Sequence, residues 1–430
     1  MTATIIIASI VFILMIISII FDLKIKLGKV SFCLYWVFAL LGAVLLICIG
    51  EVSLKQILQN FTTNLPINPI KILIIFFSMT CVSVLLDEIG FFKYLAYYAL
   101  KKAKTSQRRL FIYFYIVISL LTIVTSNDII ILTFTPFICY FTKHARINPI
   151  PYIVMEFVAA NTWSLLLIIG NPTNIYLATF FGIDFVDYFL VMALPTMVCG
   201  LTSFGIMYLL FRKNLSAELE PTEELIPVPN KPLMYSCCVG LIIYIIGMAV
   251  ASYINMQMYL VGLIVSLAVF AVCIIISLIK KYSLRPIGQA VKKLPYALTP
   301  FLLSMFVIVL AFENCGLIGK ISSFLNGKSP FIVGIASFLS ANLINNIPMS
   351  VLFASALENV VPQGVNVFAA IMGSNIGAFL TPIGALAGIM YVKILKDNSV
   401  NYSFRRFVLY GLLIAVPVIC AGLTVLTLMN

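Results

Sequence analysis

Four short polar clusters interrupt segments that are otherwise long and apolar. They are Thr125-Ser126-Asn127-Asp128, Gly170-Asn171-Pro172-Thr173-Asn174, Asn345-Asn346-Ile347-Pro348 and Gly373-Ser374-Asn375-Ile376-Gly377. Hydrocarbon cannot hydrogen-bond an exposed backbone, so a helix breaks at membrane depth only where the break lines a cavity or is buried in protein. The clusters come as two pairs, one in each half of the chain, which is typical of a secondary transporter built from repeats. The sequence therefore predicts a membrane carrier and not an enzyme.

Composition supports a membrane location. Hydrophobic residues make up 62% of the 430 residues and charged residues 10%, with a mean hydropathy of +1.13. A soluble domain carries roughly 25% charged residues, so the bilayer is the solvent here. The ten cysteines form no CxxC pair and His144 is the only histidine, so the sequence indicates neither a disulfide framework nor a metal site. We expect no cofactor beyond a coupling ion, H⁺ or Na⁺.

The net charge of +12 orients the chain in the membrane. The expected topology places nearly all of the 27 lysines and arginines on one side, and only Lys55, Lys71, Lys320 and Lys328 on the other. By the positive-inside rule the basic side is cytoplasmic. We therefore expect a multi-pass protein of the cell membrane with both termini outside, and no nucleic-acid partner.

The apolar segments predict an all-α polytopic membrane protein made of two inverted repeats. The first repeat covers residues 1–213, a cytoplasmic linker covers 214–232, and the second repeat covers 233–430. Each repeat is expected to hold a re-entrant hairpin and a broken transmembrane helix. These are hairpin 110–142, entered from the cytoplasm, with broken helix 150–181, and hairpin 331–357, entered from outside, with broken helix 364–396.

The hairpin prediction depends on length and on flanking charge. A helix of 14 residues reaches roughly 21 Å, which is short of a hydrocarbon core of roughly 30 Å. Basic residues flank both outer ends of 110–142, at Arg108, Arg109, Lys143 and Arg146. The alternative for this pair is two full spans joined by a tight turn on the outside.

Helix ends at these clusters present free N–H and C=O groups, which attract anions and cations respectively. Asn, Ser and Thr add donors and acceptors without fixed charge, so the chamber suits a neutral polyhydroxyl species, an oxyanion or a dehydrated Na⁺. The predicted hinge positions of the breaks are Gly170, Pro172, Pro348, Gly373, Gly377 and Pro382. For any single asparagine, ordinary hydrogen bonding between helices is the alternative.

Asp128 is the acidic residue of greatest interest, because an ionisable group at membrane depth is costly and usually functional. It is predicted either to carry the coupling proton or to ligate a cation; capping of the second hairpin limb is the alternative. Glu156 is expected near the membrane interface, and Asp87 and Glu88 in solvated or helix-capping roles. None of the four clusters contains Lys or Arg, which argues mildly against charge pairing with a substrate carboxylate.

Several motifs together resemble a known superfamily. They are Leu86-Asp87-Glu88-Ile89-Gly90-Phe91-Phe92, Ser126-Asn127-Asp128, Asn345-Asn346-Ile347-Pro348-Met349 and Gly373-Ser374-Asn375-Ile376-Gly377 with Leu380-Thr381-Pro382-Ile383-Gly384. The chain resembles the arsenite/antimonite-efflux permeases of the ion transporter superfamily, which also holds citrate and divalent-anion/sodium symporters. The resemblance implies a scaffold, a transport domain with two opposed hairpins, and a homodimer. It implies substrate and ion positions at Asn127, Asp128, Asn171, Thr173, Asn174, Asn345, Asn346, Ser374, Asn375 and Thr381, to which the first cluster adds Ser126.

We therefore expect an ion-coupled carrier of a small anion or metalloid, with arsenite or antimonite efflux by proton antiport as the first choice. An ATPase subunit is a candidate partner if the chain is an arsenite pump. A sodium- or proton-coupled carrier of di- or tricarboxylates or inorganic anions, and a sodium/proton antiporter, are the alternatives. A membrane enzyme or signalling scaffold is disfavoured, because the sequence holds no paired metal ligands, Ser/His arrangement or sizeable soluble domain.

Overall fold

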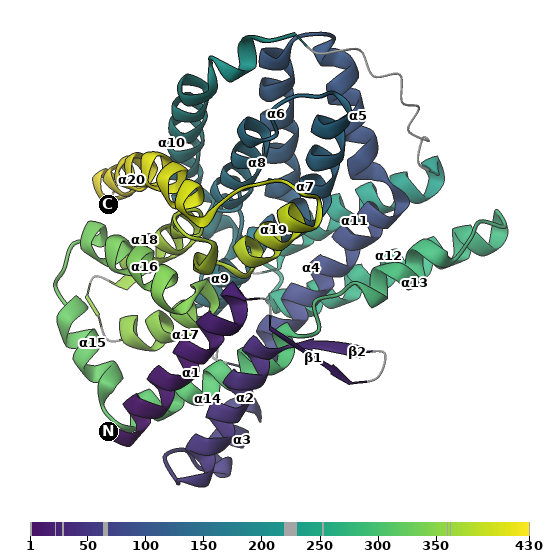
Figure 1. Ribbon diagram of the computed structural model, residues 1–430. Coiled ribbons are helices and arrows are strands. Elements are labelled where there is room, and N and C mark those ends of the chain that lie inside the picture. Colours follow the sequence, from purple (N-terminus) through teal and green to yellow (C-terminus); the bar gives the residue numbers. More distant parts are fainter. Residues whose placement is uncertain are drawn as a thin grey trace.

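The computed structural model describes residues 2–21, 23–27, 30–62, 68–218, 230–251, 253–358, 360–361 and 363–429. Within these ranges the chain is helical apart from one antiparallel hairpin, β1 (Lys24–Leu27) with β2 (Val30–Cys33) (Figure 1). The all-α prediction is confirmed with this one exception. The hairpin falls where polar and apolar residues alternate, which is the period of a strand.

Among the described residues, the first half of the chain holds ten helices and a short 3₁₀ turn. They are α1 (Thr2–Ile20), α2 (Leu34–Cys48), α3 (Leu54–Thr62), α4 (Pro69–Ile89), α5 (Phe91–Ala103), α6 (Gln107–Val124), α7 (Asn127–His144), α8 (Ile150–Trp163), η1 (Ile168–Gly170), α9 (Pro172–Phe180) and α10 (Phe185–Phe211). A second turn, η2 (Asn214–Ser216), follows α10. Of the predicted linker 214–232, residues 219–229 lie outside the described residues.

The second half repeats this order of elements. They are α11 (Lys231–Val250), α12 (Met258–Ile279), α13 (Arg285–Lys292), α14 (Leu298–Asn314), α15 (Leu317–Leu325), α16 (Pro330–Ile344), α17 (Asn346–Leu357), α18 (Gln363–Gly377), η3 (Pro382–Gly384), α19 (Leu386–Asp397) and α20 (Phe404–Leu428). The bend after α4 falls at Gly90 (φ 91°) and the bend after α14 at Gly316 (φ 76°). Glycine adopts this left-handed backbone without a steric penalty. The inversion of the two halves across a membrane stays a prediction.

Several helices are long and apolar enough to cross a bilayer. They are α4, α6, α10, α11, α12 and α20, together with the pair α14 and α15, which is bent by 83°. This confirms a multi-pass membrane protein. In the second hairpin, α16 and α17 have 15 and 12 residues and are too short to cross, at 1.5 Å per residue. In the first, α6 and α7 have 18 residues each and are longer than predicted, so the re-entrant geometry of this pair stays a prediction.

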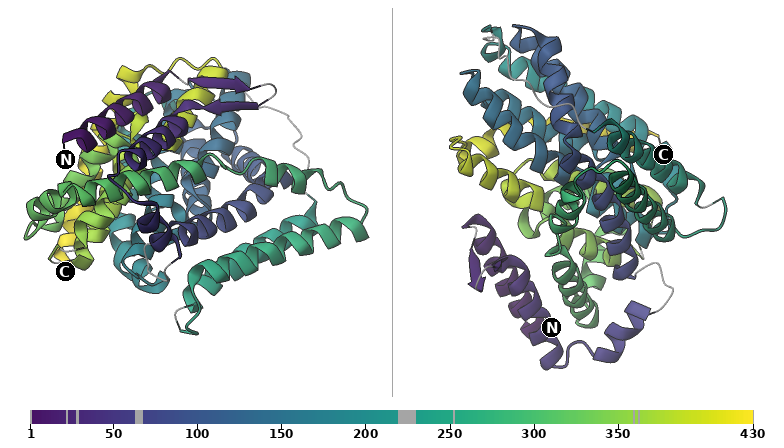
Figure 2. Two further views of the ribbon diagram at one scale, coloured as in Figure 1. Left: turned by 90° about the horizontal axis from the view of Figure 1, so that it is seen from below. Right: turned by 90° about the vertical axis from the view of Figure 1, so that its right-hand side faces the viewer.

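Helices of the first half pack directly against helices of the second half. Helix α2 packs against α14 and, in the reciprocal arrangement, α12 packs against α4; α10 also packs against α20. Helices α12 and α13 lie at the edge of the molecule, where many apolar side chains of α12 are exposed (Figure 2). In α8 every residue except Ile150 and Trp163 is buried, and in α18 every residue from Asn366 to Gly377 is buried. The breaks that follow these two helices therefore lie at the centre of the protein.

Candidate functional site

Each central helix ends in a break that contains a short 3₁₀ turn. Residues 164–171 separate α8 from α9, and residues 378–385 separate α18 from α19. Asn171 caps α9: its Oδ1 accepts hydrogen bonds from Thr173 N and Thr173 Oγ1, both at 3.1 Å. Pro172 takes the first position of α9, where a missing N–H costs nothing. Gly170 and Pro382 lie in the turns η1 and η3, as expected for the two breaks.

The prediction for the cluster 373–377 needs a correction. These residues form the last turns of α18, and the break begins after Gly377. A Cβ atom added at Gly373 would lie 2.2 Å from the carbonyl oxygen of Gly334 in α16. Gly373 is therefore a packing glycine that lets the backbones of α16 and α18 meet, and not a hinge.

The two hairpin tips differ in their contacts. Ser126 precedes α7 in an extended conformation. Asn345 precedes α17 at φ 73° and ψ 154°, a backbone conformation that costs a non-glycine residue of order 1–3 kcal/mol. Its Nδ2 donates to Ile383 O at 2.8 Å, and its Oδ1 accepts from Ile347 N at 3.3 Å. The strained tip is thus fixed to the second break, and Pro348 follows within the first turn of α17.

Four buried polar residues from both halves form what we call the amide cluster: Ser164, Asn171, Asn174 and Asn375. Asn375 Oδ1 accepts from Ser164 Oγ at 3.0 Å and from Asn171 Nδ2 at 2.8 Å. Asn375 Nδ2 donates to Asn174 Oδ1 at 2.7 Å and to Ile371 O at 2.9 Å. Asn174 Nδ2 donates in turn to Ser164 O at 2.8 Å. These asparagines make the hydrogen bonds between helices that were the alternative for each of them, and a role in binding substrate or ion stays a prediction.

Two asparagines that hydrogen-bond to predicted site residues were not identified from the sequence. Asn161 Oδ1 accepts from Asn127 Nδ2 at 3.1 Å, and Asn342 Oδ1 accepts from Thr381 Oγ1 at 2.7 Å. Asn161 lies two residues before the end of α8, as Asn375 does in α18, and each donates to the carbonyl four residues earlier. Aligning the two helix ends would have revealed Asn161, because Asn161 and Asn375 have the same position relative to the ends of their helices.

Several buried polar atoms at the centre have no hydrogen-bond partner among the described residues. They are Ser126 Oγ, Asn127 Oδ1, Thr162 Oγ1, Asn346 Oδ1 and Ser374 Oγ. All five come from the hairpin tips or from the last turns of α8 and α18. Buried polar groups are normally hydrogen-bonded, so these atoms mark places where a substrate or ion can supply the missing partner.

A cavity of about 410 Å³ reaches the first hairpin tip; we call it the inner cavity. Ser126 and Asp128 line it, opposite Phe76 and Thr80 of α4. Three lysines from separate segments also line it, namely Lys24, Lys293 and Lys393. The inner cavity thus brings lysines from three segments, together with Asp397, to the same space as Asp128.

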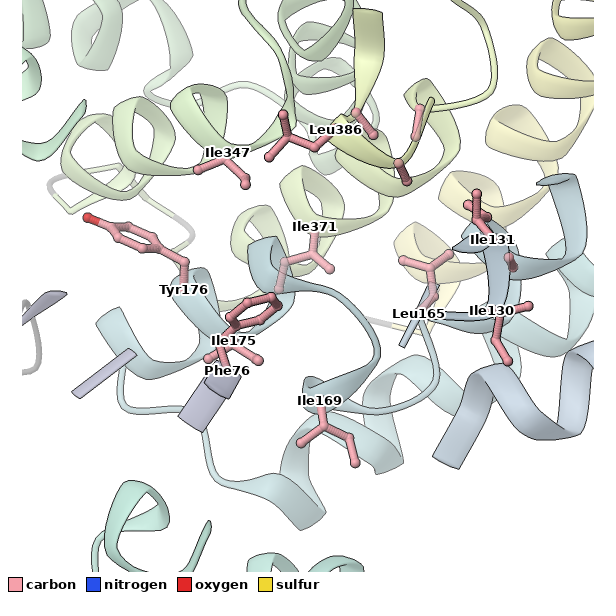
Figure 3. Close-up of a cluster of buried hydrophobic side chains, with 14 of the residues drawn as sticks. Phe76, Ile130, Ile131, Leu165, Ile169, Ile175, Tyr176, Ile347, Ile371 and Leu386 are labelled. Atoms are coloured by element: carbon pink, nitrogen blue, oxygen red, sulfur yellow. The ribbon is translucent and has the colours of Figure 1, made fainter. Parts of the chain in front are cut away.

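A second cavity of about 460 Å³, the outer cavity, touches the other half of α4. Lys71 and Ile75 line it with Asp184, and Lys71 Nζ lies 5.5 Å from the centre of the Tyr259 ring. Ile75 and Phe76 are neighbours in α4, yet they line different cavities. Figure 3 shows Phe76 beside Ile175 of α9, within a buried apolar cluster.

Glu156 of α8 is fully buried against α7, and its position near the membrane interface stays a prediction. Thr135 Oγ1 lies 3.1 and 3.0 Å from its two carboxyl oxygens and donates to them. Lys293 forms an ion pair with Glu88 at the end of α4. Within the described ranges, no three His, Cys, Asp or Glu side chains come together in a way that would hold a metal ion.

Comparison with known proteins gives consistent relatives. The family model described as "Citrate transporter" matches residues 12–371. An arsenical pump membrane protein of Escherichia coli is 25% identical over 413 residues, which cover 91% of this chain and 92% of the relative. One from Yersinia enterocolitica is 24% identical over 371 residues, covering 82% and 85%. The fold is similar to the crystal structure of the Alcanivorax borkumensis YdaH transporter, which has an unusual topology. The TM-score is 0.61 at 13% sequence identity, and the match covers 99% of this chain and 97% of that chain.

Proposed function

The chain belongs to the citrate transporter family, so it is a multi-pass membrane transporter and not an enzyme. From this family we propose that it is an ion-coupled secondary transporter of a small anion or metalloid oxyacid. Efflux of arsenite or antimonite by proton antiport is the first choice. The arsenical pump membrane proteins, which match over most of their length, support this choice. We further propose that the protein works as a homodimer, and with an ATPase subunit if it is an arsenite pump.

The observation that carries the proposal is the position of Asp128 on the inner cavity, which Ser126 also lines with a hydroxyl that has no hydrogen-bond partner among the described residues. Arsenite is As(OH)₃ at neutral pH, so it offers hydroxyl donors and acceptors without charge. Asn127 Oδ1 and Asn346 Oδ1 are the acceptors for its hydroxyls, and Ser126 and Ser374 add hydroxyls of their own. These neutral amide and hydroxyl groups suit such a cargo, because a neutral molecule bound to them brings no unpaired charge into the protein.

The predicted site residues take two roles in this proposal. Ser126, Asn127, Asp128, Asn346 and Ser374 contact cargo or the coupling ion. The remaining predicted positions hold the frame, since their side chains are already bonded to one another or to the backbone; they are Asn171, Thr173, Asn174, Asn345, Asn375 and Thr381. Protonation of Asp128 from one side of the membrane and release on the other would drive export.

A transport panel tests the proposal. In everted vesicles with an imposed pH gradient, we expect gradient-dependent accumulation of arsenite and none of citrate, succinate or sulfate. Asn346→Ala should lower arsenite uptake, because it removes an acceptor that has no partner among the described residues. Uptake of a carboxylate or of sulfate but not of arsenite would contradict arsenite efflux. Collapse of the pH gradient by sodium alone would support the sodium/proton antiporter.

One observation favours a second candidate, a sodium- or proton-coupled carrier of carboxylates. The sequence placed no cation in the polar clusters, but the structure brings Lys24, Lys293 and Lys393 to the inner cavity. Cationic side chains along a cavity raise the local concentration of anions and steer them inward. A charged substrate that enters from the basic face would meet these lysines before it meets Asp128.

Lys293 separates the two candidates experimentally. Lys293→Gln should raise the KM for a di- or tricarboxylate about tenfold, equivalent to about 1.4 kcal/mol, and leave arsenite transport unchanged. Lys292→Gln is the matched control, because Lys292 is the preceding residue, is exposed and does not line the inner cavity. Initial rates over a range of substrate concentrations measure both variants. Equal effects of the two substitutions would show that only the general surface charge matters.

A further inference from the structure

A crevice of about 580 Å³ lies between α5 and α7, beside the end of α4; we call it the lateral crevice. Its walls are apolar and aromatic, with Tyr97 and Leu100 from α5 and Phe137 and Tyr140 from α7. Figure 1 shows these two helices on the same side of the molecule. A cationic or titratable group stands one turn from an aromatic ring on each wall, since Lys93 precedes Tyr97 and His144 follows Tyr140.

The lateral crevice lies at the ends of apolar helices and not at their middles. Asp87, which lines it, is in the last turn of α4, and His144 is the last residue of α7. Tyrosine and lysine are the side chains that favour the boundary between hydrocarbon and water, with apolar bodies inward and polar tips outward. A molecule in the crevice would thus meet charge at one end and hydrocarbon-like side chains along its length.

Two atoms in the lateral crevice call for a polar ligand. The hydroxyl of Thr133, a residue only 6% exposed, lies beside the carboxyl group of Asp87, and neither this hydroxyl nor Asp87 Oδ1 makes a well-formed hydrogen bond in the described part of the chain. Asp87 accepts, whereas Thr133 both donates and accepts. A headgroup that carries an anionic phosphate together with hydroxyl groups can supply partners to both atoms and to the cation at Lys93.

We propose that the lateral crevice binds an anionic phospholipid of the phosphatidylglycerol type. The phosphate contacts Lys93 and His144, a headgroup hydroxyl donates to Asp87, and an acyl chain lies along the aromatic walls. Basic pockets between membrane helices bind such headgroups through the same combination of charge and apolar surface. The site is separate from the inner cavity, with which it shares only Leu132 and Lys293, and it does not depend on the proposed substrate.

Lipid binding to the purified full-length chain tests this proposal. In mixed detergent–lipid micelles examined by native mass spectrometry, phosphatidylglycerol should be retained in preference to phosphatidylcholine and phosphatidylethanolamine. Lys93→Gln should weaken retention of phosphatidylglycerol about fivefold, the loss expected for one basic residue at an anionic headgroup. Lys101→Gln, on the same helix but outside the lining, should leave it unchanged.

Both lysines are exposed, so neither substitution should prevent folding. Retention of the three lipids to the same extent would overturn the proposal. An equal loss in Lys93→Gln and Lys101→Gln would also overturn it, because it would assign binding to the overall charge of α5. A preference for phosphatidylglycerol that Lys93→Gln alone reduces would establish the site.

Discussion

Replacing Asp128 with asparagine is expected to abolish proton-driven transport while the protein stays folded. Asparagine has nearly the same size and keeps one acceptor, but it cannot gain or lose a proton. Asp128 lines the inner cavity beside the first hairpin tip, where water and cargo can reach it. Loss of a group that transfers protons typically lowers a rate by roughly 10²–10⁴-fold. We therefore expect uptake under a pH gradient to fall to the level of vesicles that lack the protein.

The control for this experiment is Asp187→Asn. Asp187 is an exposed acid in the first turn of α10 and lines neither the inner nor the outer cavity. Its substitution should leave both folding and transport unchanged. Exchange of labelled for unlabelled substrate, which needs no net proton movement, should survive in Asp128→Asn. Full proton-driven uptake by Asp128→Asn would remove Asp128 from the coupling step.

The second large effect is expected from Asn375→Ala, which should lower the free energy of unfolding by about 3 kcal/mol. The amide oxygen of Asn375 accepts hydrogen bonds from Ser164 and Asn171, and its amide nitrogen donates one to Asn174. Alanine would leave three fully buried polar groups each short of a partner. An unsatisfied buried polar group costs about 1–3 kcal/mol, although compensation inside membranes reduces this cost.

Denaturant unfolding of the purified protein in detergent measures this change. Asn398→Ala is the matched control, because Asn398 is only partly buried and its amide nitrogen bonds to the Ile394 carbonyl of its own helix. The control should change stability by well under 1 kcal/mol. Equal stability of Asn375→Ala and the wild type would mean that the amide cluster contributes nothing to the frame. In that case Asn375 would be assigned to direct contact with the transported substrate.

The sequence predicted where the helices break at the centre of the protein better than it predicted the hydrogen bonds among the central side chains. Polar clusters in apolar segments are conspicuous because lipid tolerates them so poorly, and the structure places both hairpin tips and both breaks near the predicted residues. Which asparagines bond to one another was not predictable. Asn375 meets Asn171 and Asn174 across separations of 204 and 201 residues, and no local pattern encodes such a contact.

Other features of the centre were missed for related reasons. Asn161 was passed over because its short polar group, with Thr162 and Ser164, was not among the four clusters; Glu156 was identified, but its contact with Thr135 was not predicted. The lysines of the inner cavity come from three distant segments, and each was explained by membrane orientation alone. Hairpin length was also underestimated, because α6 and α7 extend past the apolar stretch into flanking basic residues.

The crossed packing of the halves has a consequence for how the protein is made. Helix α4 begins at residue 69, but α12, against which it packs, begins at residue 258. At a synthesis rate of roughly 5–20 residues per second, the early helices wait on the order of ten seconds or longer for their partners. During that interval the surfaces of α2 and α4 that later meet the second half must be covered by lipid or by the insertion machinery. Nascent chains released halfway should therefore be short-lived and prone to degradation, since neither half carries its own complete set of contacts.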